Sequence, residues 1–324
     1  MQDQAVDVVG VGNAIVDVIA QASDEFLESQ DLAKGAMALI DEARAHELYD
    51  LMGPAIEASG GSAANTMAGI ASFGGTASYI GKVRKDQLGA VFAHDLRASG
   101  VAFDMPPTET GPATGRSLIL VTPDAQRTMN TYLGISSLLE PADIPAPTVE
   151  GAGLLFCEGY LWDVDSAKRA IRLAMELARG AGSRVALTLS DAFCVERHHQ
   201  DFVELVSGPV DVLFANENEL RALYGCDFDT AIERVRGHVG LGCLTRGENG
   251  SVLVTDDDTV EIKAENVGPV VDTTGAGDQY AAGVLYGLAR GFPLAEAGRL
   301  GSLAAAEVIS HVGPRPQRPL NSFL

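Results

Sequence analysis

Cysteine, tryptophan and basic residues are scarce in this chain of 324 residues. The four cysteines, at positions 157, 194, 226 and 243, form no C-x-x-C pair, so we expect reduced core thiols and neither a zinc site nor a disulfide framework. Lys and Arg number 23 against 44 Asp and Glu, which gives a formal net charge of -21. Because polyanions require a basic surface, this balance argues against nucleic acid and anionic membranes as partners.

The first twenty residues also lack the features of an export signal or a membrane anchor. No basic residue precedes their apolar stretch, and Asp7 and Asp17 interrupt it. We therefore expect a cytoplasmic protein with small-molecule ligands, either a monomer or a homodimer. With 46% hydrophobic and 21% charged residues, the composition is that of a globular protein, and the length suits one large domain with a smaller one.

Apolar runs alternate with amphipathic stretches along most of the chain. Five of these runs predict strands buried on both faces, at residues 6–12, 153–159, 184–190, 210–216 and 240–246. Residues 165–182 have helical spacing and end at glycine, as helices often do. The order of strand, helix and strand predicts an α/β domain with a mostly parallel central sheet and helices on both faces.

Two segments break this alternation, because strand-like runs follow one another in them without helices between. They lie within residues 14–41 and 113–137 and predict strands of a small, separate sheet. We expect the two segments to pair into a lid that excludes water from a reaction. The large domain would then consist of residues 1–13, 42–112 and 138–324, with the proline-rich stretch 140–151 returning the chain to it.

Three clusters of glycine and polar residues follow predicted strands, where ligands bind in open parallel sheets. The first, GVGNAIVD at residues 10–17, begins like a dinucleotide fingerprint, but Ile15 stands where the third glycine is required. This weakens the hypothesis of an NAD-dependent dehydrogenase. Asp17 is a carboxylate within an apolar strand, so it requires polar partners such as the hydroxyls of a ligand.

The second cluster, GGSAAN at residues 60–65, combines glycines with polar side chains. Gly60 and Gly61 permit a close approach of the backbone, and Ser62 is a candidate cap for the helix that follows. Asn65 would then meet a polar ligand from the first turn. A capped helix of small residues that packs closely on the sheet explains the pattern equally well.

In the third cluster, Gly275, Ala276 and Gly277 precede Asp278 at the start of a predicted helix. Small residues there leave backbone amides and the positive end of the helix dipole open to an anion. A helix cap worth about 1 kcal/mol would explain Asp278 alone. It would not explain the small residues, because a cap requires one side chain whereas a phosphate requires several unobstructed amides.

DTTGAGD at residues 272–278 resembles the C-terminal signature of the ribokinase-like (PfkB) carbohydrate and nucleoside kinases. GGSAAN resembles their N-terminal signature, and N-x-x-E at residues 216–219 resembles their metal and phosphate motif. Met67 and Arg84 depart from the first signature. The resemblance implies a ribokinase-like three-layer α/β/α domain with a small β lid. Within the family, GNAIVD, TLSDAF and QRTMN are most similar to the adenosine kinases.

The resemblance implies a kinase that uses ATP and Mg²⁺ to phosphorylate a primary hydroxyl, the 5'-OH of adenosine in the first hypothesis. A sugar kinase acting on ribose or fructose, and a non-catalytic protein that binds a nucleoside or sugar, are the alternatives. Asp278 would be the general base, and the amides of Gly275, Ala276 and Gly277 would form an anion hole. Arg127 would bring positive charge from the lid to the transferred group, unless it is a surface arginine.

The resemblance also implies roles for the residues that bind ligands. Those expected to contact the acceptor are Asp17, Gly60, Gly61, Ser62 and Asn65, with Met37, Tyr160 and Phe193 as candidates for contact with a base. Those expected to contact the donor nucleotide are Asn216, Thr245 and Gly247. Glu219 and Asn216 would orient Mg²⁺ through water. Asp272 would either help to bind K⁺ or serve as a structural turn carboxylate.

Overall fold

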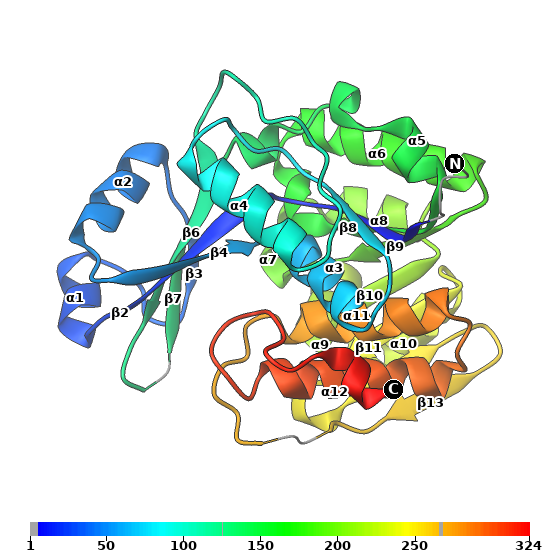
Figure 1. The fold of residues 1–324 in the computed structure, drawn as a ribbon. Coiled ribbons are helices and arrows are strands. Elements are labelled where there is room, and N and C mark those ends of the chain that lie inside the picture. Colours follow the sequence, from blue (N-terminus) through cyan, green and yellow to red (C-terminus); the bar gives the residue numbers. More distant parts are fainter. Residues whose placement is uncertain (1–5, 125, 266–267) are drawn as a thin grey trace.

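The computed structural model describes residues 6–124, 126–265 and 268–324. Residues 1–5, which belong to the range 1–13 of the expected large domain, lie outside the described residues. The described strands form one sheet of eight strands and one of five (Figure 1). This arrangement confirms the expected large α/β domain with a second, small sheet.

The large sheet has the strand order β13-β12-β11-β10-β9-β8-β1-β5. Its strands from β5 to β11 are parallel, whereas β12 runs antiparallel to both β11 and β13. The five strands predicted from apolar runs are confirmed. The bounds are β1 (Val6–Val11), β5 (Ala77–Ile80), β8 (Ala152–Glu158), β9 (Arg184–Thr188), β10 (Val212–Asn216), β11 (Leu241–Thr245), β12 (Ser251–Val254) and β13 (Thr259–Ile262).

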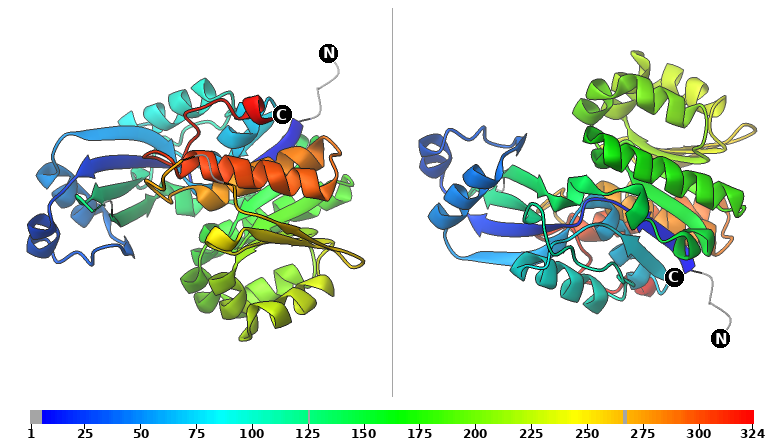
Figure 2. Two further views of the ribbon diagram at one scale, coloured as in Figure 1. Left: turned by 90° about the horizontal axis from the view of Figure 1, so that it is seen from below. Right: turned by 90° about the horizontal axis from the view of Figure 1, so that it is seen from above.

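Helices cover both faces of the large sheet, which makes three layers (Figures 1 and 2). One face carries α3 (Ser62–Ser72), α4 (Gln87–Ala98), α11 (Ala276–Ala289) and α12 (Leu294–Val308). The other carries α5 (Ala146–Glu150), α6 (Asp165–Gly180), α7 (Ala192–Arg197), α8 (His199–Val206), α9 (Glu217–Tyr224) and α10 (Phe228–Arg236). Short 3₁₀ turns are η1 (Ile135–Leu138), η2 (Pro141–Asp143), η3 (Gly159–Asp163), η4 (Gly247–Asn249) and η5 (Leu320–Phe323).

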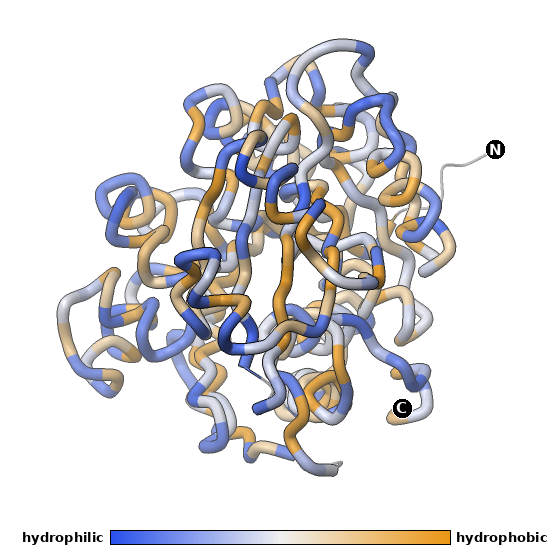
Figure 3. The backbone as a smooth tube through the Cα atoms, turned by 90° about the vertical axis from the view of Figure 1, so that its left-hand side faces the viewer, coloured by the Kyte–Doolittle hydropathy of each residue, from blue (hydrophilic) through white to orange (hydrophobic). Residues whose placement is uncertain are grey.

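Alternation along the strands builds a separate core on each face of the large sheet. Val9 and Val11 of β1 pack in the core beneath α6, whereas Val8 packs in the core beneath α3 and α11. A strand buried on both faces needs apolar residues at every position, which is why the predicted runs are continuous. Figure 3, a view from the side of the small sheet, shows apolar stretches along the strands and hydrophilic turns around them.

The small sheet has the order β3-β7-β6-β2-β4 and stands to one side of the large domain (Figures 1 and 2). Its bounds are β2 (Ile15–Gln21), β3 (Met37–Leu39), β4 (Ala55–Gly60), β6 (Thr114–Val121) and β7 (Arg127–Gly134), with helices α1 (Asp24–Ser29) and α2 (Glu42–Leu51) between its strands. The expected lid boundary is corrected, because β4 falls within the range 42–112 and pairs antiparallel with β2. β4 lies at the sheet edge with Ile56 71% exposed, so its sequence shows no apolar alternation.

Candidate active site

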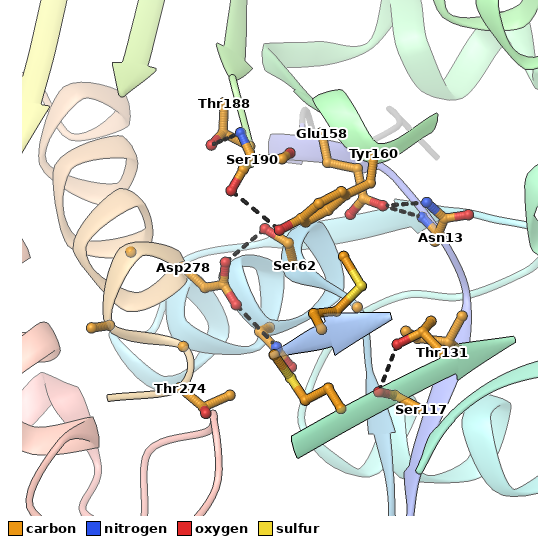
Figure 4. A pocket seen from close by; sticks show the side chains of 18 of the residues that line it. Asn13, Ser62, Ser117, Thr131, Glu158, Tyr160, Thr188, Ser190, Thr274 and Asp278 are labelled. Carbon is orange, nitrogen blue, oxygen red and sulfur yellow. Dashed lines mark hydrogen bonds between the residues drawn. The ribbon is translucent and has the colours of Figure 1, made fainter. Parts of the chain in front are cut away.

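The carboxyl ends of the parallel strands and the inner face of the small sheet enclose a cleft of about 490 Å³. Residues at or just beyond the ends of β1, β8, β9, β10 and β11 line it, together with the first turns of α3 and α11. Ligands of open parallel sheets bind at this place. Figure 4 shows that side chains from the large domain and from the small sheet point into the same space.

The inner face of the small sheet follows the two-residue period of its strands. The residues that line the cleft from this sheet are Ile15 and Asp17, Met37 and Leu39, Ser117 and Ile119, and Met129, Thr131 and Leu133. Strand register places Asp17, Ser117 and Thr131 in one polar row, with the Ser117 and Thr131 hydroxyl oxygens 2.9 Å apart. The lid therefore offers one row of polar groups on an otherwise apolar wall.

Asp17 is a buried carboxylate in this polar row. Burial raises its pKa to about 7, which Arg315 and Arg127 oppose and the repulsion from Asp278 reinforces. A Cβ at Gly60 would lie 2.4 Å from the Asp17 carboxyl group, so the glycine makes room for it. Within the described residues no group donates a hydrogen bond to this carboxylate, which leaves its oxygens available to the hydroxyls of a ligand.

Asp278 receives hydrogen bonds from both of the polar residues predicted in the second cluster. The Ser62 hydroxyl donates to Oδ1 at 2.6 Å (Figure 4). The Asn65 amide donates to Oδ2 at 3.0 Å. Burial raises the pKa of Asp278, whereas these two hydrogen bonds and Arg315 lower it. The expected caps are corrected, because glycines at 61 and 275 precede the two helices and neither helix has a side-chain cap.

The two glycines before Asp278 have different structural reasons. Gly275 has φ +77°, and a Cβ there would lie 2.7 Å from Pro314, so the backbone itself requires glycine. A Cβ on Gly277 would meet no atom within 4 Å and would enter open space at the cleft. The expected anion hole is smaller than predicted, because the Ala276 amide already donates to the Thr273 carbonyl at 3.2 Å.

Glu158, at the end of β8, is a buried carboxylate that the sequence analysis did not identify. Its Oε1 accepts from the backbone and side-chain nitrogens of Asn13 at 2.7 and 2.8 Å, and its Oε2 accepts from the Ala63 amide at 2.9 Å. Burial raises its pKa to about 7. Asn13 joins β1 to β2 and Ala63 lies in the first turn of α3, so Glu158 fixes two places where the chain passes between the two sheets.

Arg127 and Asp272 form a buried ion pair between the lid and the turn before α11. The alternative of a surface arginine is therefore wrong. Asp272 also accepts hydrogen bonds from the amides of Thr274 at 3.0 Å and Gly313 at 2.8 Å, which gives it a structural role in the turn. The pair lines a separate cavity of about 180 Å³ and not the cleft, so this arrangement does not bring Arg127 to the expected transferred group.

The N-x-x-E motif caps helix α9. The Asn216 side-chain oxygen accepts from the amides of Asn218 and Glu219 at 2.9 and 3.0 Å, and its nitrogen donates to the Glu219 carboxylate at 2.6 Å. Asn216 thus caps the helix in this arrangement, and its backbone and side-chain nitrogens donate to the two carboxylate oxygens of Glu219. Glu219 lines the cleft, and burial with the nearby charge of Asp191 raises its pKa to about 7.

The remaining predicted ligands divide between the cleft and its surroundings. Those that line the cleft are Met37, Gly61, Tyr160 and Thr245, whereas Gly60, Gly247 and Phe193 do not line it. Phe193 is 72% exposed on α7, so the predicted contact of this side chain with a base is not supported. The part of the chain that the structure describes contains no cluster of three or more His, Cys, Asp or Glu side chains that would hold a metal ion.

A helix N-terminus beside a carboxylate suits the transfer of a phosphoryl group to an alcohol, because the first stabilises charge and the second accepts a proton. Fold and cleft thus place the molecule among the α/β phosphotransferases that act on small molecules. The family model described as pfkB family carbohydrate kinase matches residues 55–320, which is most of the chain. The chain belongs to this family, as the sequence motifs predict.

Two similar solved structures cover nearly the whole chain. An adenosine kinase from Sinorhizobium meliloti is 50% identical over 98% of this chain and 98% of that chain, with a TM-score of 0.93. A probable sugar kinase from Rhizobium etli CFN 42 is 46% identical over 99% of this chain and 98% of that chain, also with a TM-score of 0.93. Adenosine kinase 1 of Arabidopsis thaliana is 26% identical and covers 96% of each chain.

These comparisons confirm the ribokinase-like fold and an enzyme that transfers a phosphoryl group to a hydroxyl of a small sugar or nucleoside. Kinases of this family use ATP with a divalent metal ion. Among the helices of the described residues, none is long and apolar enough to cross a membrane.

Proposed function

We propose that this protein is a nucleoside kinase that transfers the γ-phosphoryl group of ATP to the 5'-OH of adenosine, giving AMP. The apolar wall of the lid carries the proposal. Its side chains include Met37 and Leu39, which are 39% and 51% exposed although they line the cleft. A purine base would cover this wall, whereas ribose or fructose would leave it in contact with water. The similarity to two adenosine kinases supports the proposal.

Two carboxylates of the cleft would have different roles towards the acceptor, one in binding and one in proton transfer. Asp17 would accept hydrogen bonds from the vicinal hydroxyls of the ribose. Asp278 would take the proton of the 5'-OH as its oxygen forms a bond to the γ-phosphorus and the bond to ADP breaks. Asp278 already accepts a hydrogen bond from one alcohol, the Ser62 hydroxyl at 2.6 Å, as it would from the 5'-OH.

The phosphates of the donor would lie against the turn at Gly275 and Gly277. Glu219 fits a divalent cation held through water, because it is a buried carboxylate at the cleft and no basic group lowers its pKa. Mg²⁺ bound there would neutralise charge on the phosphates. Thr245, at the end of β11, would contact the donor from the same side. K⁺ binding by Asp272, a cytoplasmic location and a monomeric or homodimeric state stay predictions.

A panel of acceptors tests the proposal through ADP formation with adenosine, inosine, ribose and fructose. Covering roughly 120 Å² of apolar surface at about 25 cal/mol per Å² contributes about 3 kcal/mol, so kcat/KM for adenosine should exceed that for ribose by about 100-fold. Equal or faster turnover of ribose or fructose would identify a sugar kinase. Binding of these molecules with no turnover of any would favour the non-catalytic alternative.

Two substitutions in the lid test directly whether its apolar wall contacts the base. Leu39→Ser should lower kcat/KM for adenosine and leave that for ribose unchanged, because Leu39 lines the cleft. Ile56→Ser is the matched control, since Ile56 is also an exposed apolar residue of the small sheet but does not line the cleft. If both substitutions affect adenosine equally, the apolar wall does not hold the base.

A further inference from the structure

Arg315 lies between two prolines in the C-terminal segment, and the sequence analysis did not identify it. Its Nε donates to the Oδ1 atom of Asn65 at 3.3 Å, across 250 positions of sequence. Its Nη1 donates to the Ser99 hydroxyl at 3.0 Å and lies 3.6 Å from a carboxylate oxygen of Asp95. The Arg315 side chain is only 16% exposed. The largely buried guanidinium group of Arg315 thus contacts Asn65 on the side opposite to Asp278.

The segment that carries this arginine is tied firmly to the turn before α11. The Gly313 amide donates to Asp272 at 2.8 Å, and the Gln279 side chain donates to the Pro314 carbonyl at 3.0 Å. Further along the segment, two more amides donate to the buried carboxylate of Glu307. The guanidinium group thus projects from a backbone that is fixed on both sides.

We propose that Arg315 is a positioning residue that fixes the side-chain amide of Asn65 in the orientation that donates to Asp278. A guanidinium group can only donate hydrogen bonds, and an ionised carboxylate can only accept them. Asn65 lies between these two groups, so its oxygen must face Arg315 and its nitrogen must face Asp278. Turned by half a rotation, the amide would set donor against donor and acceptor against acceptor.

This orientation matters because a general base must offer an ionised oxygen to the acceptor hydroxyl. The Asn65 amide donates to Oδ2 of Asp278 and the Ser62 hydroxyl donates to Oδ1, and both hydrogen bonds favour the ionised carboxylate by lowering its pKa. The inference rests on the proposed role of Asp278 as the base. It does not depend on whether the acceptor is a nucleoside or a sugar.

The charge of Arg315 acts in the same direction as its hydrogen bond. The titratable groups whose charges interact with Asp278 or Arg315 are Asp17, Tyr79, Asp95, Glu158 and Tyr160. Most of these groups are acidic, and Arg315 lowers the pKa of both Asp278 and Asp17 against the effect of burial. Removal of this charge should therefore reduce the ionised fraction of the base at a given pH.

Three substitutions separate the hydrogen bond from the charge. Arg315→Met removes both, Arg315→Gln retains a donor without charge, and Arg315→Lys retains the charge. Arg318→Met is the matched control, because Arg318 lies in the same segment but is exposed and stacks on the ring of Phe323. Each protein is assayed for kcat, KM and the pH profile of kcat, with whichever acceptor the wild type phosphorylates best.

Arg315→Met should lower kcat by about 10- to 100-fold, the usual effect of losing a hydrogen bond to a charged group. The acid limb of kcat, measured with saturating acceptor so that the effect of Asp17 on KM does not enter, should move to higher pH in Arg315→Met and Arg315→Gln and stay near the wild-type position in Arg315→Lys. Arg318→Met should match the wild type. A kcat within about threefold of wild type in Arg315→Met would overturn the proposal.

A merely structural role for Arg315 would lower the thermal midpoint and the active fraction and leave the pH profile unchanged, which also overturns the proposal. If Arg315→Met does not fold, the Gln and Lys variants decide by the same readouts. A titration of the Asp278 carboxyl by ¹³C NMR, assigned with Asp278→Asn, needs no turnover. Its pKa should rise in Arg315→Gln even if adenosine is not the acceptor, so failure of the proposed function is distinguishable.

Discussion

The two glycines of the turn before Asp278 allow folding and phosphate binding to be tested separately. Gly277→Ala and Gly277→Val add side chains where the structure has open space at the cleft. Gly275→Ala adds the same methyl group where the backbone has φ +77° and Pro314 lies 2.7 Å away. The same chemical change should therefore affect binding at one position and stability at the other.

The two alanine substitutions should change the free energy of unfolding in opposite directions. Alanine at position 277, inside the first turn of α11, should stabilise the free protein by about 0.4 to 1 kcal/mol because it reduces the freedom of the unfolded chain. Alanine at position 275 should destabilise it by about 1 to 2 kcal/mol for the left-handed backbone alone, with the contact at Pro314 adding to this. The thermal midpoints of the two variants should move apart.

The effect on kcat should be large at position 277 and small at position 275. Gly277→Val should lower kcat by about 10² to 10³, an effect as large as the loss of one anion-hole donor, because its side chain occupies the space of the transferred group and keeps that group away from the amides. Gly275→Ala should retain most of its activity per folded molecule. Thermal melts and a coupled assay of ADP formation measure both quantities. Wild-type kcat in a stable Gly277→Val protein would refute the placement of the phosphates on this turn.

Two further predictions concern the carboxylates of the cleft. Asp278→Asn should lower kcat by about 10² to 10⁴ without loss of thermal stability, because the new amide still accepts from Asn65 and a buried charge is removed; activity within about tenfold of wild type would exclude the base role. Asp17 has a pKa of about 7 in the free enzyme, and its ionised form accepts the hydroxyls of the ligand. The acceptor KM should therefore fall as pH rises through about 7 and should lose this dependence in Asp17→Asn, as initial rates across pH will show; a flat wild-type profile would contradict this.

The large domain was predictable because its signals are local. Strands buried on both faces need continuous apolar runs, and α6 carries its stripe of apolar residues within one segment. β4 was missed because an edge strand with Ile56 exposed has no need of that pattern. Its membership of the small sheet depends on pairing with β2, which no local property of residues 55–60 indicates.

The site was predictable to the extent that its residues lie in motifs. Ser62, Asn65 and Asp278 lie in glycine-rich clusters that the sequence displays, and the structure brings them together. Glu158 and Arg315 act through contacts with residues 145 and 250 positions away, so no spacing rule leads to them. Phe193 was misjudged because the sequence does not show that its ring points to solvent.

The discontinuous construction of the small sheet has a consequence for changing the acceptor. The groups that face the cleft come from four strands, β2, β3, β6 and β7, and each contributes every second residue. No single stretch of chain can therefore be transplanted from another kinase to carry a new preference. A change of acceptor would require substitutions of individual side chains on this face. The residues between them point to the opposite face of the sheet, where Val16 and Leu118 pack in a core with Leu48 of α2, so they could stay unchanged and keep the scaffold intact.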